Sequence, residues 1–542
     1  MRYRALRIWL LCSMLSASAF GGVSYAQDEQ KNTKQLELQI LSNPKDEKVT
    51  QSLQALCEMY FSQAEYTQLI DFLTKLGKKK VPVCVVPIGY YLGLCRYHQL
   101  KHLEETQNWK EYFDLGNMYR EELFSETQKV SEACPLSSFG VRAQLINWLQ
   151  HRAQNDTQSE GALRKLMDMV SAFAKAQPDI EVVKEVADAL AANEEAALAK
   201  STYALYVNCL LEAGKSPLKL ESSAEEALKE GNFDLAEIIY ERYIETIRGT
   251  LAKNTLAFEL IAIIRNFATD GWTKGNDPRY AEKVFGILEE SCGKEYFTQE
   301  LQYLRAYNLQ RFKEYARSAE EYTLCITNFP KSSYVDEAEF KLGILYVYLL
   351  GQKEKGISHW QNVIERNGSL SYVAESLYHK SLLGHYAQDT ESAKEGYAKI
   401  LALVSDSPDF KNLRERVMAR QKEIDESKPI EYNLRVFLDA SLQQPQSSHA
   451  GIELWVSLYK TLSFKQEEVK FSSQQFLIET GCLAPELTYL WSGDLGSISP
   501  IPTAQEFTTD YQTLGTRVVN LVVVSPSGVI GSTLEMVDVY KS

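Results

Sequence analysis

The 542-residue chain has few basic side chains, few cysteines and few long apolar runs, and each shortage excludes a class of protein. Its 58 Lys and Arg stand against 72 Asp and Glu, which gives a net charge of −14. Nucleic-acid binding requires clustered basic residues that neutralise phosphates, and the short run from Lys78 to Lys80 is too small to supply them. Nine cysteines are too sparse for a disulfide-built fold. We expect most of them to be small buried hydrophobes, with one or two adventitious disulfides as the alternative.

Common catalytic motifs are also missing, since His-Glu-x-x-His, Gly-x-Ser-x-Gly and Cys-x-x-Cys do not occur. Ala213 to Ser216, Ala-Gly-Lys-Ser, has the tail of a phosphate-binding loop, but Cys209 stands where the first Gly is required. We interpret this segment as the C-terminal stop of a helix. His379 and His385 lie about 120° apart around a helix and so do not share a metal-binding face; we expect one to be partly exposed and one to be packed. The chain is not expected to be an enzyme, and we expect no catalytic residues, cofactor or metal.

The N-terminus has the pattern of an exported protein. Met1 to Arg7 is basic, Ile8 to Val23 is mostly apolar, and Ser24-Tyr25-Ala26 ends the run with a small-x-small cleavage pattern. This order predicts a signal peptide over residues 1–26, too short for a typical membrane span, followed by a flexible segment over 27–46. We expect an exported protein, either periplasmic or extracellular and outer-membrane-associated, with no transmembrane span in the mature chain.

From residue 47 to 428 apolar residues recur at the three- and four-residue spacing of amphipathic helices. One expected helix is long, from Gln99 to Val130. Farther along, Ser333 to Gly343 aligns without gaps on Ser371 to Ser381, an offset of 38 residues. Self-similarity at a fixed period within helical sequence predicts an α-solenoid of stacked helical hairpins over residues 47–428.

The repeated segments resemble tetratricopeptide (TPR) repeats. Gly231 to Tyr243 fits half of that pattern, and Tyr315 to Gly343, with Phe329-Pro330 at the junction, resembles the repeats of TPR proteins of the bacterial cell envelope. The second copy departs from the pattern, with Ser381 for the Gly of the first helix and Gln388 for the Gly of the turn.

The TPR resemblance implies a concave face, formed by the first helix of each repeat, on which a partner protein binds. It places candidate partner-binding residues at Glu337, Phe340, Ile344, Val347 and Tyr348 in one repeat, and at Glu375, Tyr378, Leu382, His385 and Tyr386 in the next. Exposed aromatic residues beside carboxylates would suit a peptide with apolar and basic side chains. The alternative is that these residues pack against neighbouring helices.

After Lys428-Pro429 the pattern changes to short strands separated by turn residues. The expected strands are Glu431 to Asp439, Ile452 to Tyr459, Val469 to Ile478, Leu487 to Trp491, Glu506 to Tyr511, Thr516 to Val524 and Ser532 to Val539. They predict an all-β immunoglobulin-like sandwich over residues 429–542. Tyr489 to Gly496 and Thr509 to Val523 resemble a PKD domain, although the usual Asp-Phe after the Trp is absent.

Two functions fit these patterns. The first is a non-enzymatic exported scaffold that binds a protein partner of the cell envelope through its TPR-like repeats. The alternative is a surface glycan-binding or adhesion protein in which the PKD-like domain makes the contact and the solenoid is a spacer. Trp455 and Trp491 would then be candidates for stacking on sugar rings, although a sandwich Trp such as Trp491 is more commonly buried in the core.

Overall fold

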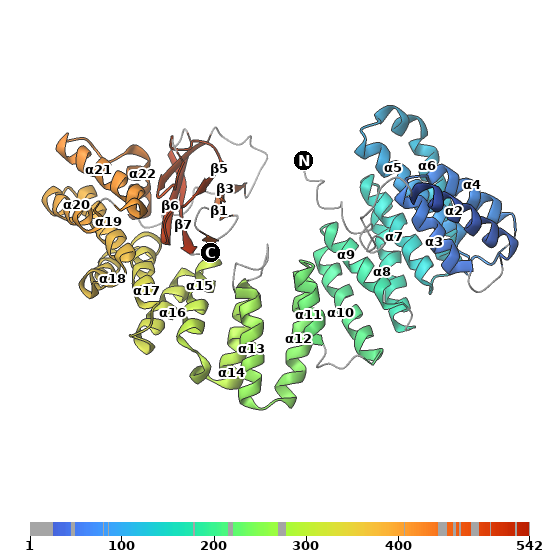
Figure 1. Ribbon diagram of the computed structural model, residues 1–542, viewed down its shortest axis with the longest axis horizontal. Helices are drawn as coiled ribbons and strands as arrows, with labels where there is room; N and C mark the ends of the chain where they lie inside the picture. Colours follow the sequence, from blue (N-terminus) through green and yellow to red (C-terminus); the bar gives the residue numbers. More distant parts are fainter. Residues whose placement is uncertain are drawn as a thin grey trace. The chain divides into compact units, whose positions relative to one another are not determined.

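The protein is mainly α-helical, with a C-terminal region of strands in small sheets (Figure 1). A computed structural model describes residues 25–44, 49–79, 81–84, 86–176, 179–214, 220–268, 278–405, 407–442, 452–458, 462–464, 468–477, 487–498, 500–525 and 528–540. The chain divides into two compact units, residues 1–246 (unit 1) and 247–542 (unit 2). The predicted signal peptide lies, except for its last two residues, outside the described residues.

Unit 1 consists, where it is described, of helices, and from α2 to α10 consecutive helices pack on one another. They are α2 (Tyr25–Ser42), α3 (Val49–Ser62), α4 (Tyr66–Gly77), α5 (Ile88–Glu105), α6 (Trp109–Ala133), α7 (Ser138–Ala153), α8 (Ser159–Lys175), α9 (Ile180–Ala192), α10 (Ala196–Glu212), α11 (Leu220–Lys229) and the first part of α12 (Phe233–Thr250). The segment expected to be flexible is helical over most of its length as α2. Ile40 of this helix is buried, and Glu37 accepts a hydrogen bond of 2.6 Å from the Tyr60 hydroxyl of α3.

Unit 2 continues with helices and ends in strands. Its helices are α13 (Lys253–Ala268), α14 (Pro278–Cys292), η3 (Lys294–Tyr296), α15 (Gln299–Arg311), α16 (Tyr315–Asn328), α17 (Val335–Ile344), the π-helical turn η4 (Leu345–Leu349), α18 (Lys353–Arg366), α19 (Leu370–Tyr386), α20 (Thr390–Val404), η5 (Pro408–Phe410), α21 (Lys411–Asp425) and α22 (Tyr432–Leu442). None of the helices in the described ranges of either unit is both long and apolar enough to cross a membrane.

Many of the hairpins turn on a residue with a left-handed backbone. Ala64, Gln107, Glu194, Lys313 and Gln388 have φ between 54° and 67°, and each stands two residues before the next helix begins. Gly231 and Gly351 occupy the same position in their own hairpins. The single helix predicted from Gln99 to Val130 is therefore wrong, because the turn at Gln107 divides it into α5 and α6.

Gln388 stands where the TPR-like pattern has a turn glycine, and this replacement is expected to lower the stability of unit 2. Its φ of 65° equals that of Gly351, and a side chain in this conformation costs roughly 1 kcal/mol that glycine avoids. We expect Gln388→Gly to stabilise unit 2 by up to about 1 kcal/mol, less the entropy that glycine gains in the unfolded chain. Denaturant titration would measure this, with Gly351→Gln as the matched reverse change. Destabilisation by Gln388→Gly would show that contacts of the glutamine side chain outweigh the strain.

The two repeat copies place glycine at different positions where the paired helices cross. A Cβ atom on Gly343 of α17 would come within 2.0 Å of Nε1 of Trp360, which is fully buried on α18. In the second copy Ser381 takes the place of this glycine, and the facing residue is Gly396 of α20, whose added Cβ would lie 1.9 Å from the Ser381 hydroxyl. The first crossing also has Gly356 on α18, whose added Cβ would lie 2.8 Å from the Gly343 carbonyl oxygen. In the second crossing the glycine on the facing helix, Gly396, explains why Ser381 is tolerated.

Cys84 and Cys134 form a disulfide that joins the segment before α5 to the residue after α6. The other described cysteines are free and buried, as predicted: Cys57, Cys95, Cys209, Cys292 and Cys325. Cys482 lies outside the described residues. Burial raises the pKa of Cys95 to about 12, so its thiol stays protonated and unreactive.

Loss of this disulfide is expected to destabilise unit 1 strongly. The bridge closes a loop of 50 residues, and losing that constraint on the unfolded chain costs about 4 kcal/mol. Cys84→Ser with Cys134→Ser should therefore melt at a lower temperature than the wild type under non-reducing conditions. Dithiothreitol should lower the wild-type melting temperature to that of the variant and leave the variant unchanged. Equal melting temperatures without reductant would contradict the prediction.

The strands form two sheets. β1 (Ile452–Leu458), β3 (Glu468–Leu477) and β5 (Glu506–Asp510) make one sheet in the order β1-β3-β5, and β2 (Leu462–Phe464), β4 (Thr488–Gly493), β6 (Gly515–Ser525) and β7 (Gly528–Tyr540) make the other in the order β2-β7-β6-β4. All pairs are antiparallel except β2 with β7. The strand predicted from Glu431 to Asp439 is wrong, because this segment is helix α22. Its buried residues Leu434, Phe437 and Leu438 have the three- and four-residue spacing of a helix.

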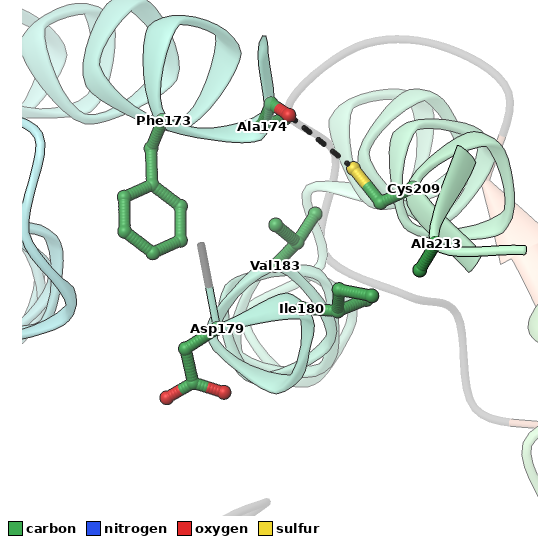
Figure 2. Close-up of a pocket in the computed structure, with 7 residues that line it drawn as sticks. All are labelled: Phe173, Ala174, Asp179, Ile180, Val183, Cys209 and Ala213. Atoms are coloured by element: carbon green, nitrogen blue, oxygen red, sulfur yellow. Dashed lines mark hydrogen bonds between the residues drawn. The ribbon is translucent and has the colours of Figure 1, made fainter. Parts of the chain in front are cut away.

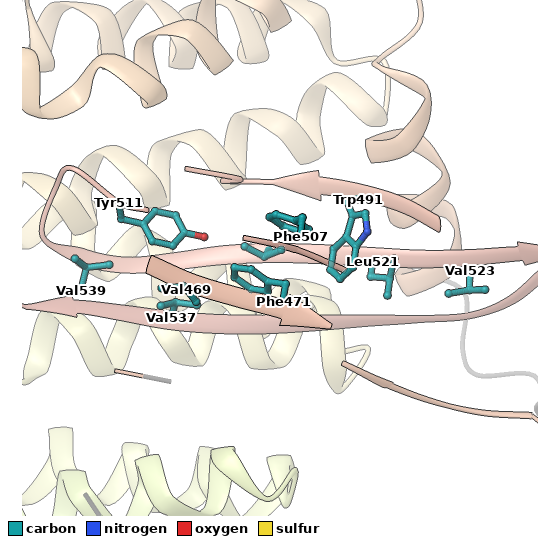
Figure 3. Packing of buried hydrophobic residues seen from close by; sticks show 10 residues of the cluster. Val469, Phe471, Trp491, Phe507, Tyr511, Leu521, Val523, Val537 and Val539 are labelled. Atoms are coloured by element: carbon teal, nitrogen blue, oxygen red, sulfur yellow. The ribbon is translucent and has the colours of Figure 1, made fainter. Parts of the chain in front are cut away.

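One apolar cluster draws on both sheets (Figure 3). Phe471 and Phe507 of the first sheet pack on Trp491 of the second, and the Trp491 and Phe507 ring centroids are 4.9 Å apart. The opposite side of β6 and β7 is buried as well, through Val518, Val522 and Met536. A sheet buried on both faces must be covered on its second face. Helix α22 packs against β4, β6 and β7 and supplies part of that cover.

Candidate functional site

The predicted partner-binding residues lie together in unit 2 but are not exposed. Glu337 and Phe340 are on α17, Tyr348 is in η4, and Glu375, Tyr378, His385 and Tyr386 are on α19. Tyr386 is half-buried and the other six are buried; Ile344, Val347 and Leu382 are also buried. The expectation of an open face lined by exposed aromatic residues is therefore wrong for this part of the chain. We call the surface formed by these residues the α17/α19 face.

The α17/α19 face is covered by later parts of the same unit. The Tyr348 ring lies 5.5 Å from that of Phe437 on α22, and the Tyr386 hydroxyl donates a hydrogen bond to Asp439 of the same helix. At the start of α19, the Ser371 hydroxyl donates to the carbonyl of Leu514, the residue directly before β6. The part of the chain that contacts this face is therefore its own C-terminal region.

A buried charge cluster centred on Lys341 joins α17 to β7. Lys341 is fully buried, and its Nζ lies 2.7 Å from Oδ2 of Asp538 and 3.0 Å from Oε1 of Glu337. The same ammonium donates to the Tyr303 hydroxyl at 2.7 Å, which in turn donates to Glu337 at 2.5 Å. Oδ1 of Asp538 accepts a 2.7 Å hydrogen bond from Thr516 of β6. Burial raises the pKa of Asp538, and the Lys341 charge opposes that rise.

A second cluster joins α19 and α21 to the strand region. Nη2 of Arg416 lies 2.6 Å from Oε1 of Glu375 and 3.5 Å from Oδ2 of Asp494. Arg517 of β6 lies 3.8 Å from the same Glu375 oxygen and 3.7 Å from the same Asp494 oxygen. Two arginines therefore balance two carboxylates, as buried charges require. The Arg416 guanidinium also lies 4.6 Å from the centre of the Tyr378 ring, so this candidate residue packs on a cation of its own chain.

Both histidines of α19 are buried, so the expectation that one is partly exposed is wrong. His379 stacks on Trp360 with ring centroids 5.3 Å apart, and its Nδ1 is hydrogen-bonded to the Tyr348 hydroxyl at 3.0 Å. Burial, aided by the charge of Arg416, lowers the pKa of His379 to about 3. Burial and the charge of Arg420 lower the pKa of His385 to about 4. Both imidazoles are therefore neutral at neutral pH, and His379 acts as a packing group.

A small pocket lies in unit 1 between the end of α8, the start of α9 and the end of α10 (Figure 2). It encloses about 160 Å³ and is lined by Phe173, Ala174, Asp179, Ile180, Val183, Cys209 and Ala213. The Cys209 thiol points to the Ala174 carbonyl at 3.7 Å, and burial raises its pKa. Nearby, α10 ends at Glu212, directly before the Ala-Gly-Lys-Ser segment, and Gly214 has a left-handed φ of 86°, as is common after the end of a helix. This pocket combines one carboxylate with mainly apolar walls and no activated nucleophile.

The residues that hold the strand region were not singled out from the sequence. They form ion pairs between residues that stand far apart in the chain: Lys341 with Asp538, and Arg416 and Arg517 with Asp494. Lys341 and Asp538, for example, are 197 residues apart. One signal was present, because the apolar run of β6, Val518 to Val524 with Asn520 as its one polar residue, is typical of a strand buried on both faces. Trp491, a candidate for sugar stacking, is instead fully buried in the core and donates from Nε1 to the Ala504 carbonyl at 2.9 Å. The side chain of Trp455 lies outside the described part of the structure.

Among the described residues no group of His, Cys, Asp and Glu has the arrangement of a metal site. No protein-family model matches the chain, and no curated protein matches it. The function is therefore inferred from the residues and their contacts alone.

Proposed function

We propose that the protein is a non-enzymatic exported scaffold that binds a protein partner of the cell envelope through TPR-like repeats. The helices of residues 47–428 would form the solenoid, and the two C-terminal sheets would form an immunoglobulin-like, PKD-like sandwich. The observation that carries the proposal is that α17 and α19 already bind strands β6 and β7 through paired charges, Lys341 with Asp538 and Glu375 with Arg517. Complementary charges of this kind contribute to the specificity of protein interfaces.

The covered face limits where a partner can bind. Because the α17/α19 face is filled by the chain's own C-terminal region, a partner must use other helices or the exposed side of the strand region. The buried charges of Lys341 and Arg416 are paired with Asp538 and Asp494 of the strand region, which supports a structural role for them. The glycan-binding alternative loses Trp491 as a stacking residue, because Trp491 belongs to the core, and would then depend on Trp455.

Two features support export. The N-terminal sequence has the order of a signal peptide, and Cys84 is joined to Cys134 by a disulfide. Disulfides persist in oxidising compartments such as the periplasm and the cell exterior and are rare in the cytosol. An exported protein that has lost its signal peptide should begin at Gln27, which mass measurement of the mature chain would show.

Crosslinking in the native cells tests the scaffold role. A tagged full-length chain would be crosslinked, the attached proteins identified, and each one then tested for binding to the purified chain. We expect at least one envelope protein to bind reproducibly in both settings. Recovery of no protein above a tag-only control, or binding of purified envelope polysaccharide alone, would contradict the proposal.

A further inference from the structure

The tip of the α5–α6 hairpin in unit 1 carries two exposed aromatic residues. Trp109 and Phe113 are 50% and 74% exposed, and a spacing of four residues places them on one face of α6. The Tyr112 ring lies 5.9 Å from that of Trp109 and 5.7 Å from that of Phe113. Single exposed apolar residues are ordinary on protein surfaces, but adjacent large aromatic residues at the end of a hairpin form a patch.

The exposed patch lies on the part of α6 that α7 does not reach. The last turn of α5 lies beside it, where Glu104 accepts a 2.9 Å hydrogen bond from the Tyr112 hydroxyl. α7 packs on the C-terminal part of α6, where Phe124 stacks on His151 of the last turn of α7 at 4.2 Å. Figure 1 shows the α5–α6 hairpin extending beyond α7. Thr127 and Ser131, which follow Trp109 and Phe113 by five helical turns on the same face, are fully buried. This side of α6 is therefore exposed at Trp109 and Phe113 and buried in the second half of the helix.

The size of the uncovered stretch suits a helix. The exposed residues Trp109, Phe113, Asn117 and Glu121 lie along one side of α6 and, at a rise of 1.5 Å per residue, span roughly 18 Å. This length matches about three turns of a second helix lying beside it, in the position that α7 would occupy if it were longer. A helix with one apolar face could cover both aromatic rings.

The surroundings of the patch are acidic. Residues 101–122 carry six carboxylates against the three basic side chains Lys101, Lys110 and Arg120. Arg120 is held over the Tyr112 ring at 4.8 Å, which makes it part of the patch itself. Asp114 and Glu121 are exposed along α6. The charge of the rim therefore favours a ligand with Lys or Arg on its polar side.

We propose that Trp109 and Phe113 anchor a basic amphipathic helix of a partner protein at the tip of the α5–α6 hairpin. This inference rests on the proposed scaffold role and assigns it a surface distinct from the α17/α19 face. The aromatic rings supply the apolar contact, and the carboxylates of the rim select the charge of the polar side. Aromatic anchors of this kind carry a large share of the energy of interfaces.

Two designed peptides test the proposal with the full chain. One is an 18-residue amphipathic helix of Leu and Lys, and the other replaces every Lys by Glu. We expect the labelled Leu/Lys peptide to bind, as measured by fluorescence anisotropy, and the Leu/Glu peptide not to bind. Trp109→Ser with Phe113→Ser should weaken binding of the Leu/Lys peptide by roughly tenfold or more without changing the net charge. A higher salt concentration should also weaken binding of this peptide to the wild type.

Phe258→Ser is the matched control, because Phe258 is 71% exposed on α13; it should bind the peptide like the wild type. Circular dichroism melting should show that all variants stay folded, since exposed residues are replaced. Binding that is equal for both peptides, absent for both, or unchanged in the Trp109/Phe113 variant would overturn the proposed surface. Self-association of the full chain that this variant abolishes would overturn it too, by assigning the surface to a second copy. None of these results would affect the scaffold role, which the crosslinking in cells tests separately.

Discussion

Lys341→Met should destabilise unit 2 by about 3 to 5 kcal/mol, because it leaves buried carboxylates without their cation. Methionine fills the space of the lysine stem, so the loss reports the charge and not a cavity. Asp538→Asn should cost less, since Glu337 stays 3.0 Å from the ammonium. Chemical denaturation followed by circular dichroism would measure both changes.

The effect of Lys341→Met should depend on pH in a defined direction. Burial raises the pKa of Asp538, and Lys341 opposes this rise in the wild type; without the lysine the folded-state pKa must rise further above its unfolded value. Stability is then retained at low pH, where the carboxyl is protonated in both states, and is lost as pH rises through the raised pKa. Lys380→Met on the exposed side of α19 is the control and should change stability by less than about 0.5 kcal/mol. A loss in Lys341→Met that is small at every pH would show that water already reaches the cluster.

Tyr348→Ala with Tyr378→Ala should come close to unfolding unit 2. Both rings are buried, and truncating a large buried aromatic residue costs about 3 to 5 kcal/mol, against a total of about 5 to 15 kcal/mol for a typical domain. The two changes are close enough to interact, so the sum is an approximate guide. Thermal melting of the single and double variants would measure the loss.

The same pair of changes distinguishes a packing role from a binding role. Residues that anchor a partner on an open face would lower affinity while leaving the melting temperature unchanged. Tyr432→Ala is a suitable control, because this tyrosine is 56% exposed on the neighbouring helix α22. If the double variant melted like the Tyr432 variant, the α17/α19 face would have to be open in solution. Tyr348→Phe should cost only about 1 kcal/mol, through loss of the hydrogen bond to His379.

Local pattern predicted most of the secondary structure, and its failures have local causes. The apolar periodicity located the helices, and alternation located β1 and β3 to β7 within a few residues, but the three-residue strand β2 was missed. The hairpin turn at Gln107 was missed because the left-handed position holds a glutamine, where only glycine would have been a signal. Helix α22 was taken for a strand because a short segment containing Leu434, Val436 and Leu438 also alternates.

The candidate site failed for a different reason. Tyr348 and Tyr378 are buried by contacts with later elements, Phe437 of α22 and Arg416 of α21. Glu375 of the same face is paired with Arg517, which lies more than a hundred positions later. Periodicity shows that a side is apolar and does not show what covers it. Two indications were available that these parts of the chain meet. One is Lys341 within the apolar pattern of α17, and the other is strand β6, which is apolar on both faces.

The position of β6 and β7 in the chain has a consequence during synthesis. The helices that form the α17/α19 face emerge well before the strands that cover it. Until more than a hundred further residues have been made, Lys341 lacks Asp538 and Glu375 lacks Arg517. Such an incompletely covered state is prone to aggregation. Any change that slows the arrival of the last strands should therefore reduce the yield of folded protein before it alters the stability of the finished molecule.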